Sequence, residues 1–383
     1  MTIDQELIEW VIRQRRYLHE NPELSGEEHE TRTYLLHELN QMNLEVLSFD
    51  SLSVVACLKG TEGRHTIALR ADMDALPVQE EGDKPALSNK PGVSHVCGHD
   101  GHIAILLGAA KWLSQHREQV KPNVLFIFQS SEEISPSGAE ELVSQGVLEQ
   151  VDAIFGIHLW QPLEKGKIGL CSGPMMASCD DFEITVNGKG GHGSMPDQTI
   201  DPIYIAGHLI TAIQSIVSRQ TSPIDPAVIS IGKVVAGTGY NVIPSTATLS
   251  GTIRTFSQEV RQRIPVQLEE LVTGICKGFG ATANVSVYPG LPPVVNDRDM
   301  VSLAERILSS TQGAERIEYV RPVMGAEDFA HYLLEKPGAF LFVGMNGEKS
   351  AYPHHHPRFD LDEDVFPLAI SLWIDLVLQF ESH

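Results

Sequence analysis

The chain has 383 residues, of which 42% are hydrophobic and 20% are charged. This composition is typical of a globular protein, and the length exceeds what one ordinary core needs, so we expect two domains. The 50 acidic residues outnumber the 28 Lys and Arg residues and give a formal net charge of -22 at pH 7. Because such a surface repels phosphate backbones and anionic lipids, it argues against nucleic-acid and membrane partners.

The N-terminal residues and the cysteines bear on where the protein resides. Met1–Leu7 has neither a basic start nor a long apolar run, so no signal peptide is expected. No stretch reaches the roughly 18 continuous apolar residues of a membrane span. The five cysteines are odd in number and scattered, which favours a reducing compartment over a disulfide framework. We therefore expect a cytoplasmic protein.

Strands and helices alternate through the first 160 or so residues and again after about residue 291. This rhythm predicts an α/β fold with a mainly parallel sheet, whose ligands gather beyond the carboxyl ends of the strands. The expected helices cover about residues 4–19, 26–42, 103–115, 138–146, 298–310 and 362 onward, and the expected strands cover 44–49, 54–58, 65–70, 123–129, 151–157 and 339–343.

The pattern changes near Pro174. Apolar and polar residues then alternate in several segments, which is typical of half-buried antiparallel strands. We therefore expect a smaller α+β domain inserted into the first. Its expected strands cover about residues 180–187, 227–235, 246–255 and 283–288, and its expected helices cover 201–218 and 258–279.

A dense group of polar residues precedes the helix expected at about residue 103. The stretch Ser94–His102 contains three histidines, a cysteine and an aspartate, and Gly98 allows the tight turn that lets Cys97 and His99 converge. Metal ligation explains this density better than packing does, because Cys and His are ligands for borderline divalent metals. A nucleophilic Cys/His pair is the rival chemical interpretation.

Further candidate ligands follow other strands. The pair Glu132–Glu133 comes after the strand over 123–129, His158 follows the strand over 151–157, and His354–His356 precede the last helix. About five such ligands can hold two divalent ions that share a water, roughly 3.5–4 Å apart. The nucleophilic-cysteine interpretation leaves these groups unused.

The adjacent carboxylates can divide two tasks. A strand end can direct Glu133 at the metals while Glu132 faces the shared water. A glutamate in that position can take a proton from water and pass it to the leaving amine. We therefore favour Glu132 as the base and Glu133 as a ligand over two solvated surface acids.

The chain contains seven short motifs, which are, in order, Arg70–Pro77, His95–His102, Phe128–Glu133, Gly156–His158, Gly190–Pro196, Tyr240–Pro244 and Gly325–Phe329. These motifs resemble those of the aminoacylase/carboxypeptidase superfamily of dinuclear metallohydrolases. The Cys-Gly-His-Asp form is similar to its amidohydrolase branch, which contains hippurate hydrolases, auxin-conjugate hydrolases and bacterial N-acyl-amino-acid deacetylases. The resemblance covers nearly the whole chain.

The resemblance implies a discontinuous catalytic domain, residues 1–177 and 291–383, and an inserted lid domain, residues 178–290, that often dimerises. It implies that Glu132 is the catalytic base. It also implies that His192 of the lid reaches the substrate carbonyl, often from the partner subunit. The metal ligands that it implies are Cys97, His99, Glu133, His158 and His355.

Other positions are matched less directly. Asn241 and Arg254 correspond to lid residues that meet the substrate carboxylate in similar enzymes, and a planar guanidinium suits a carboxylate. Arg254 could instead be an arginine on the surface of a strand. The peptidase branches carry a metal-binding histidine where this chain has Asp72, so Asp72 is not expected as a ligand, whereas Asp74 could orient one.

We therefore expect a metal-dependent amidohydrolase that cleaves N-acyl-L-amino acids, N-acetyl or related, to a carboxylic acid and a free amino acid. It would use two divalent ions (Zn, Mn, Ni or Co) and form a homodimer or a higher homo-oligomer. A dipeptidase or carboxypeptidase on the same scaffold is one alternative. A catalytically silent metal- or ligand-binding homologue is another, and the retained Glu132 argues against it.

Overall fold

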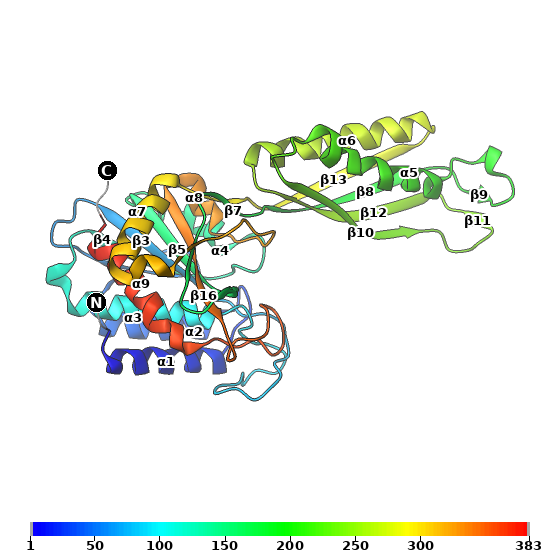
Figure 1. Ribbon diagram of the computed structural model, residues 1–383. Helices are drawn as coiled ribbons and strands as arrows, with labels where there is room; N and C mark the ends of the chain where they lie inside the picture. The colour runs from blue at the N-terminus through cyan, green and yellow to red at the C-terminus, as the bar shows by residue number, and fades with distance from the viewer. Residues whose placement is uncertain (1–2, 381–383) are drawn as a thin grey trace. The chain divides into compact units, whose positions relative to one another are not determined.

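The computed structural model describes residues 3–380, which form two compact units (Figure 1). The first unit takes the chain up to Gly173, Val295–Arg321, and the chain from Asp328 onward. The second unit takes Pro174–Val294 and Pro322–Glu327. The assignment of residues 178–290 to a lid and dimerisation domain stays a prediction.

An eight-stranded sheet forms the centre of the first unit. Its strands, in sheet order, are β1 (Glu45–Leu47), β2 (Val54–Leu58), β4 (Asn123–Gln129), β3 (Thr66–Asp72), β5 (Ala153–Glu164), β16 (Gly338–Asn346), β6 (Ile168–Leu170) and β15 (Ile317–Tyr319). The central strands β4, β3, β5 and β16 are parallel to one another. Strands β1, β2 and β4 pair antiparallel at one side, as do β16 and β6 at the other. The predicted α/β fold with a mainly parallel sheet is therefore confirmed.

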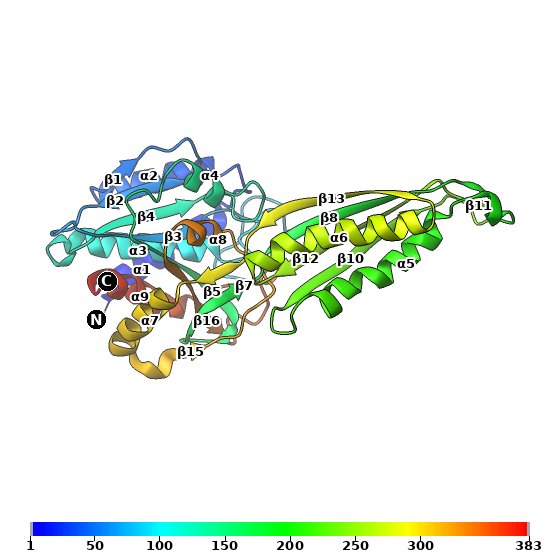
Figure 2. The same ribbon diagram turned by 90° about the horizontal axis from the view of Figure 1, so that it is seen from above.

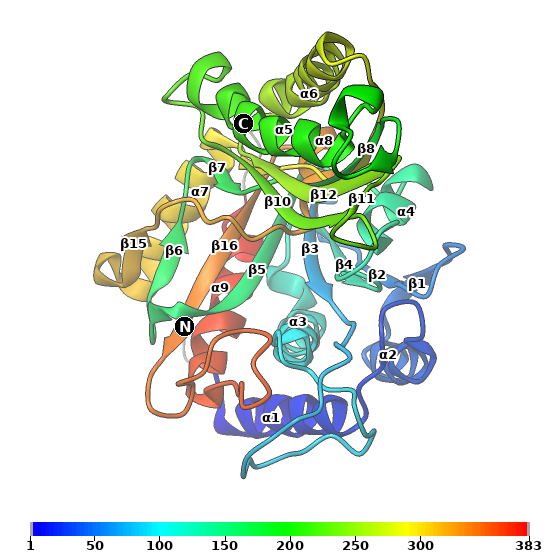
Figure 3. The same ribbon diagram turned by 90° about the vertical axis from the view of Figure 1, so that its right-hand side faces the viewer.

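Helices cover both faces of this sheet. The α-helices of the first unit are α1 (Gln5–Glu20), α2 (His29–Gln41), α3 (His99–Gln115), α4 (Gly138–Ser144), α7 (Arg298–Leu308), α8 (Ala330–Glu335) and α9 (Phe366–Leu378). Helices α1 and α9 pack on α3, which lies against β3, while α4 packs on α8. Figure 3 shows α1 and α3 on one side of the sheet and α4 on the other. Because both faces are covered, β4 can carry the apolar run Val124–Phe128, which is buried throughout.

Strand β5 is longer than its sequence predicted. It was expected to end at Ile157, but it continues to Glu164. Strand β3 pairs with β5 only as far as Gly156, whereas β16 runs beside β5 beyond that point and places Phe342 opposite His158. Since β16 supplies the hydrogen-bonding partner, the polar residues after Ile157 stay in the strand. His158 therefore lies inside a strand and not after its end.

The second unit is built on a four-stranded antiparallel sheet. In sheet order its strands are β10 (Ala227–Ala236), β12 (Thr246–Thr255), β8 (Cys179–Asn187) and β13 (Thr282–Leu291). Helices α5 (Pro202–Ser215) and α6 (Gln258–Gly278) lie side by side on one face of the sheet (Figures 1 and 2). Buried residues alternate with less buried ones along β8, as expected for a sheet with one covered face.

Short elements complete the second unit and the connections. Strands β9 (Gly191–His192) and β11 (Val242–Ile243) pair near one end of the four-stranded sheet (Figure 1). The chain passes between the units through β7 (Gly173–Met176) and β14 (Val294–Asn296). None of the helices within residues 3–380 combines the length and the apolar character that a bilayer crossing requires.

Candidate metal centre

A tight turn at Gly98 sets Cys97 and His99 at the start of α3. Gly98 has a φ of 98°, in the left-handed region, and a Cβ there would lie 3.1 Å from Leu361 Cδ2. The turn therefore favours glycine. Cys97 is 9% exposed and His99 is 1% exposed, so a buried thiol precedes the turn and a buried imidazole begins the helix.

Four of the five predicted ligands lie in direct contact. Cys97 Sγ is 3.5 Å from His158 Nε2 and 3.4 Å from His355 Nε2. His355 Nε2 is in turn 3.3 Å from Glu133 Oε1. A thiol, two imidazoles and a carboxylate from four separate parts of the chain thus converge on one place.

His99 joins the group through two overlapping sets of ligand atoms. One set holds His99, Glu132 and Glu133, the other holds Cys97, Glu133 and His355, and the atoms of each set lie within 4.8 Å of one another. Glu133 belongs to both sets. The arrangement can therefore serve two neighbouring ions, the second sharing a ligand with the first.

Backbone carbonyls orient two of the imidazoles. His99 Nδ1 donates to the carbonyl oxygen of Asp74 at 2.9 Å, and His158 Nδ1 donates to that of Leu159 at 2.9 Å. In each ring Nδ1 is thereby occupied, and Nε2 is the nitrogen left for a metal ion. This is how metal-binding histidines are commonly held.

Two buried atoms of the cluster lack ordinary hydrogen bonds within the described part of the chain. His99 Nε2 has no hydrogen-bond partner there, and Glu133 Oε1 has only its 3.3 Å ion pair with His355 Nε2. Buried polar atoms are nearly always paired, so each such exception needs a reason. A divalent cation supplies one, and imidazole, carboxylate and thiolate are together the donors that ions such as zinc accept. The residues present therefore fit the metal ions that the sequence implies.

Burial and charge act differently on two of these imidazoles. Burial, and then the neighbouring His102 and His354, hold the pKa of His158 well below its usual range, so this ring is neutral and can bind a cation. Burial opposes a charge on His99, but Asp72 and Cys97 outweigh it and hold its pKa well above the usual range. The cluster around His99 therefore attracts positive charge.

Asp74 contacts two of the predicted ligands. Its Oδ2 accepts from the backbone N–H of Glu133 at 2.9 Å and from Ser25 Oγ at 2.6 Å, and its Oδ1 lies 3.3 Å from His99 Nδ1. The side chain is 0% exposed. The geometry suits a residue that orients His99 and Glu133.

Asp72 and His102 satisfy one another and do not face the cluster with a free atom. Asp72 accepts from His102 Nδ1 at 2.6 Å and from Arg70 Nη1 at 2.7 Å. His102 Nε2 accepts from the backbone N–H of Leu159 at 2.9 Å. Both ring nitrogens of His102 are thus in use. No role was predicted for Arg70 beyond its place in a motif, although a basic residue inside a buried strand is a signal that it pairs with an acid.

The three consecutive histidines take three different environments. His355 has a φ of 64° and reaches Cys97 and Glu133 as described. His354 stacks on Trp160 and accepts from the backbone N–H of Gln161 at 3.2 Å, and it forms a further set of ligand atoms with Cys97 and His158. His356 instead stacks on Tyr352. The fold therefore offers His355 and His354, but not His356, to the cluster.

Glu132 follows a residue with an unusual backbone conformation. Ser131 has a φ of 55°, and its backbone N–H donates to Glu28 Oε1 at 2.7 Å. Burial, and then the nearby Asp74, raise the pKa of Glu28 to about 7. Glu132 is 7% exposed and belongs to the set with His99 and Glu133. A buried carboxylate thus stands beside the predicted ligands.

The second unit holds the other three predicted residues. His192 and Val242 are opposite each other in β9 and β11, and the N–H of Gly193 donates to the carbonyl of Asn241 at 2.8 Å. His192 Nδ1 accepts from the N–H of Ser194 at 3.1 Å, which leaves the proton on the exposed Nε2.

Arg254 lies on the neighbouring four-stranded sheet. It belongs to β12, opposite Val228 of β10. Its Nη1 donates to Thr252 Oγ1 and, at 3.1 Å, to the carbonyl of Ile253. Part of the guanidinium is therefore held by its own strand.

The sequence did not reveal a buried cluster of charged side chains at the start of α3. Asp100 is 0% exposed and binds both Arg15 Nε and His19 Nδ1 at 2.8 Å. Its only sequence signal is that Arg15 and His19 are four residues apart, which places them on one face of α1. Nothing in the sequence alone pairs them with Asp100.

Comparison with known proteins agrees with this geometry. The chain is 42% identical over 374 residues to N-acetylcysteine deacetylase of Bacillus subtilis, covering 96% of each chain. It is 47% identical over 287 residues to N-acyl-L-amino acid amidohydrolase of Geobacillus stearothermophilus, covering 75% of this chain and 78% of that one. A Bacillus subtilis protein whose crystal structure is described as a dinuclear metal binding peptidase of the M20 family matches with a TM-score of 0.87 and 39% identity, over 98% of each chain.

A family model spans most of the sequence. The model of peptidase family M20/M25/M40 matches residues 68–379, a range that contains every predicted metal ligand and the whole second unit. The resemblance to dinuclear metallohydrolases drawn from the seven motifs is confirmed. The chain belongs to peptidase family M20/M25/M40.

Proposed function

We propose that this protein is a metal-dependent amidohydrolase that cleaves N-acyl-L-amino acids to a carboxylic acid and a free amino acid. The observation that carries the proposal is the convergence of Cys97, His158, His355 and Glu133 within 3.5 Å contacts, with Glu132 beside them. The deacetylase and the amidohydrolase among the relatives act on this class of substrate by their names, which supports the assignment.

Five residues would hold two divalent ions. We assign Cys97, His99, Glu133, His158 and His355 as the ligands, with Asp74 orienting His99 and Glu133. When bound, the ions polarise the amide carbonyl and lower the pKa of water at the site. We propose zinc, manganese, nickel or cobalt, because these borderline ions accept the mixed thiolate, imidazole and carboxylate donors.

Glu132 is the proposed proton carrier. It is 7% exposed and stands beside His99 and Glu133. From there its carboxylate can take the proton of the attacking water and then deliver it to the nitrogen of the leaving amino acid. Glu133 cannot take this role while it serves as a ligand, so the two adjacent carboxylates have separate tasks.

The second unit is the proposed source of substrate recognition. The exposed Nε2–H of His192 is a donor suited to the oxyanion that forms on the acyl carbonyl. Arg254 and Asn241 are proposed to bind the α-carboxylate of the amino acid. We further propose that this unit is a lid and dimerisation domain, that His192 serves the site of a partner subunit, and that the protein works in the cytoplasm as a homodimer or a larger homo-oligomer.

An assay with defined metals tests the proposed function. Metal-free protein is reconstituted with Zn, Mn, Co or Ni and offered N-acetyl, N-benzoyl and indole-acetyl amino acids together with dipeptides. Turnover of the N-acyl amino acids is expected. Preference for dipeptides would support the peptidase alternative. No turnover with any pairing would support a silent homologue and contradict the proposal.

A further inference from the structure

The segment that carries His355 needs to be held in place. We call residues 353–360 the histidine loop. His355 has a φ of 64°, a conformation that a non-glycine residue keeps only when its surroundings fix it. Its backbone N–H donates to the carbonyl of Val96 at 2.8 Å, next to Cys97. The side chain is 53% exposed, so packing around the ring is not what fixes it.

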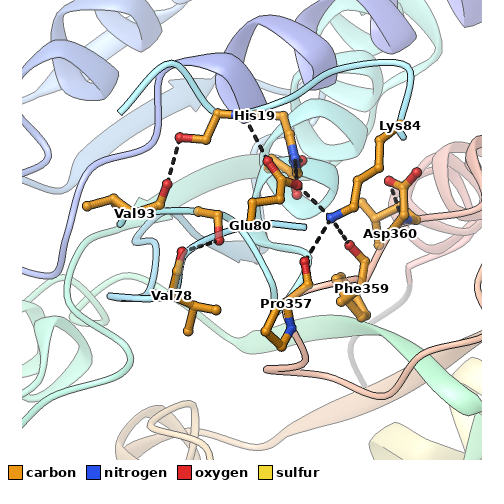
Figure 4. Close-up of polar contacts among 12 residues, drawn as sticks. His19, Val78, Glu80, Lys84, Val93, Pro357, Phe359 and Asp360 are labelled. Atoms are coloured by element: carbon orange, nitrogen blue, oxygen red, sulfur yellow. Dashed lines mark hydrogen bonds and ion pairs between the residues drawn. The ribbon is translucent and has the colours of Figure 1, made fainter. Parts of the chain in front are cut away.

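A buried lysine binds the histidine loop just beyond His355. Lys84 Nζ donates to the carbonyl of Phe359 at 2.5 Å, to that of Pro357 at 3.5 Å, and to Glu80 Oε1 at 2.6 Å. Figure 4 shows these three contacts converging on the lysine nitrogen. The Lys84 side chain is 5% exposed. All three protons of its ammonium group thus have acceptors inside the protein.

Glu80 holds Lys84 from the other side. Its side chain is 3% exposed, and besides Lys84 it accepts from His19 Nε2 at 2.7 Å (Figure 4). It also accepts from the N–H of Ser88 at 2.8 Å. Burial opposes its charge, but His19 and Lys84 outweigh it and lower the pKa of Glu80 to about 2. Glu80 is therefore a carboxylate with fixed neighbours.

The same chain of contacts leads to α3. His19 Nδ1 is 2.8 Å from Asp100 Oδ2, and Asp100 directly follows His99. Arg15 binds Asp100 at 2.8 Å and, at 2.7 Å, Asp360 at the end of the histidine loop. The loop is thus connected to the helix that begins with His99 by two sets of contacts, one through Lys84 and one through Arg15.

Stability alone is a weak reason for such an arrangement. Burying charged groups is expensive, and well-packed apolar residues often stabilise a fold as well or better. A buried ammonium group, unlike an apolar side chain, fixes the positions of particular carbonyl oxygens through its hydrogen bonds. Here the fixed carbonyls belong to residues two and four positions after His355.

We propose that Lys84 is a positioning residue of the metal centre. Held by Glu80, which His19 binds in turn, it fixes the carbonyls of Pro357 and Phe359 and thereby sets the approach of His355 to Cys97 and Glu133. This inference rests on the proposed function, because it takes His355 as a metal ligand.

The test compares Lys84→Met with Lys90→Met. Methionine keeps an apolar side chain of similar length but removes the ammonium. Lys90 is a matched control because it lies in the same part of the chain and pairs with Glu30 at 3.2 Å, away from the histidine loop. Mn²⁺ titration of the metal-free proteins is expected to show two ions bound by wild type and by Lys90→Met. In Lys84→Met, one ion should bind on the order of tenfold more weakly while the other is unchanged.

A second measurement needs no metal. Amide hydrogen exchange of the metal-free proteins should be faster at His355 and its neighbours in Lys84→Met than in wild type, and unchanged in Lys90→Met. Wild-type exchange and wild-type affinity for both ions in Lys84→Met would overturn the proposal. If Lys84→Met does not fold, Glu80→Gln is measured instead, with the same expectation, because it removes the charge that holds Lys84.

A double variant separates positioning from general stability. In a His355→Ala background, Lys84→Met should weaken Mn²⁺ binding no further, because its effect passes through His355. Losses that add in the double variant would also overturn the proposal. A wild-type protein that binds no divalent ion would contradict the proposed function, whereas the hydrogen-exchange comparison would still decide whether Lys84 fixes the histidine loop.

Discussion

In the first unit the predicted metal ligands are held by buried contacts, whereas in the second unit the predicted substrate-binding residues are held mostly by their own strands. His99 is 1% exposed and bonded through Nδ1, and Glu133 is fixed through its N–H by Asp74. His192 is exposed, and its bonds go to Ser194 two residues away. The candidate metal ligands are thus held more firmly than the candidate recognition groups, which can adjust more easily.

The largest expected effect separates the two adjacent glutamates. Glu132→Gln should keep both ions yet lose about 10²- to 10⁴-fold in kcat, because it removes a proton carrier without removing a ligand. Glu133→Gln should instead lower the metal content. Steady-state kinetics and elemental analysis check both, and identical metal contents in the two variants would contradict the division of roles.

Metal removal should act on the first unit and spare the second. At a free ion concentration of about 1,000 times Kd, a bound ion stabilises the fold by about 4 kcal/mol, and the predicted ligands all belong to the first unit. A chelator should therefore lower the unfolding temperature of the first unit only. Hydrogen exchange followed on β4 and on β8 measures the two units separately. An equal loss of protection on β4 and on β8 would contradict the prediction that metal ions stabilise the first unit alone.

His192→Ala should lose about 10²- to 10³-fold in kcat, which is the usual effect of deleting one oxyanion donor, with metal content unchanged. If His192 serves a partner's site, mixing His192→Ala with Glu132→Ala should restore activity, because hybrid dimers contain one intact site. Subunit exchange shown independently, with no restored activity, would place His192 in the site of its own subunit.

Arg254 offers a smaller and more specific test. A charge-assisted pair with the substrate carboxylate is worth roughly 1.5–3 kcal/mol, or about one to two powers of ten in kcat/KM. Arg254→Ala should lose this on the acid substrate but little further on the amidated substrate. Simple addition of the two losses would mean that Arg254 acts through folding or assembly.

The smallest expected effect concerns the N-terminal cap of helix α5 in the second unit. Asp201 caps α5 by accepting from the N–H of Ile203 at 2.9 Å, and losing such a cap costs about 1 kcal/mol. Asp201→Ala should lower the stability of the second unit by about that amount, as measured by denaturant unfolding, and leave the metal content as in wild type. A change in metal content would show that the two units are not independent in this respect.

The sequence predicted the elements with strong periodicity best. The strands Val54–Leu58, Asn123–Gln129 and Thr246–Thr255 have the predicted bounds, because uninterrupted apolar or alternating runs end there at turn residues. Helix α2 begins at His29, three residues later than expected. Strand β5 exceeds its prediction because its length depends on β16, which lies far along the chain.

The candidate site could be predicted only in part for the same reason. Cys97 and His99 are close in sequence, so their turn was visible, and the motif order supplied the other donors. The pairing of Lys84 with Phe359 or of Arg15 with Asp100 joins residues that no local pattern connects. Both His354 and His355 lie near Cys97, and the left-handed φ of 64° at His355 is not visible in a run of three identical residues.

The overhang of β5 past β3 has a consequence for how this site can change over evolutionary time. His158 stands in a strand that is hydrogen-bonded to β16 and not in a connecting segment. Insertions and deletions accumulate in loops, where the backbone is free to adjust. The position of His158 in the sheet is consequently unaffected by such changes. The surrounding loops can vary in length while His158 stays in register with β16.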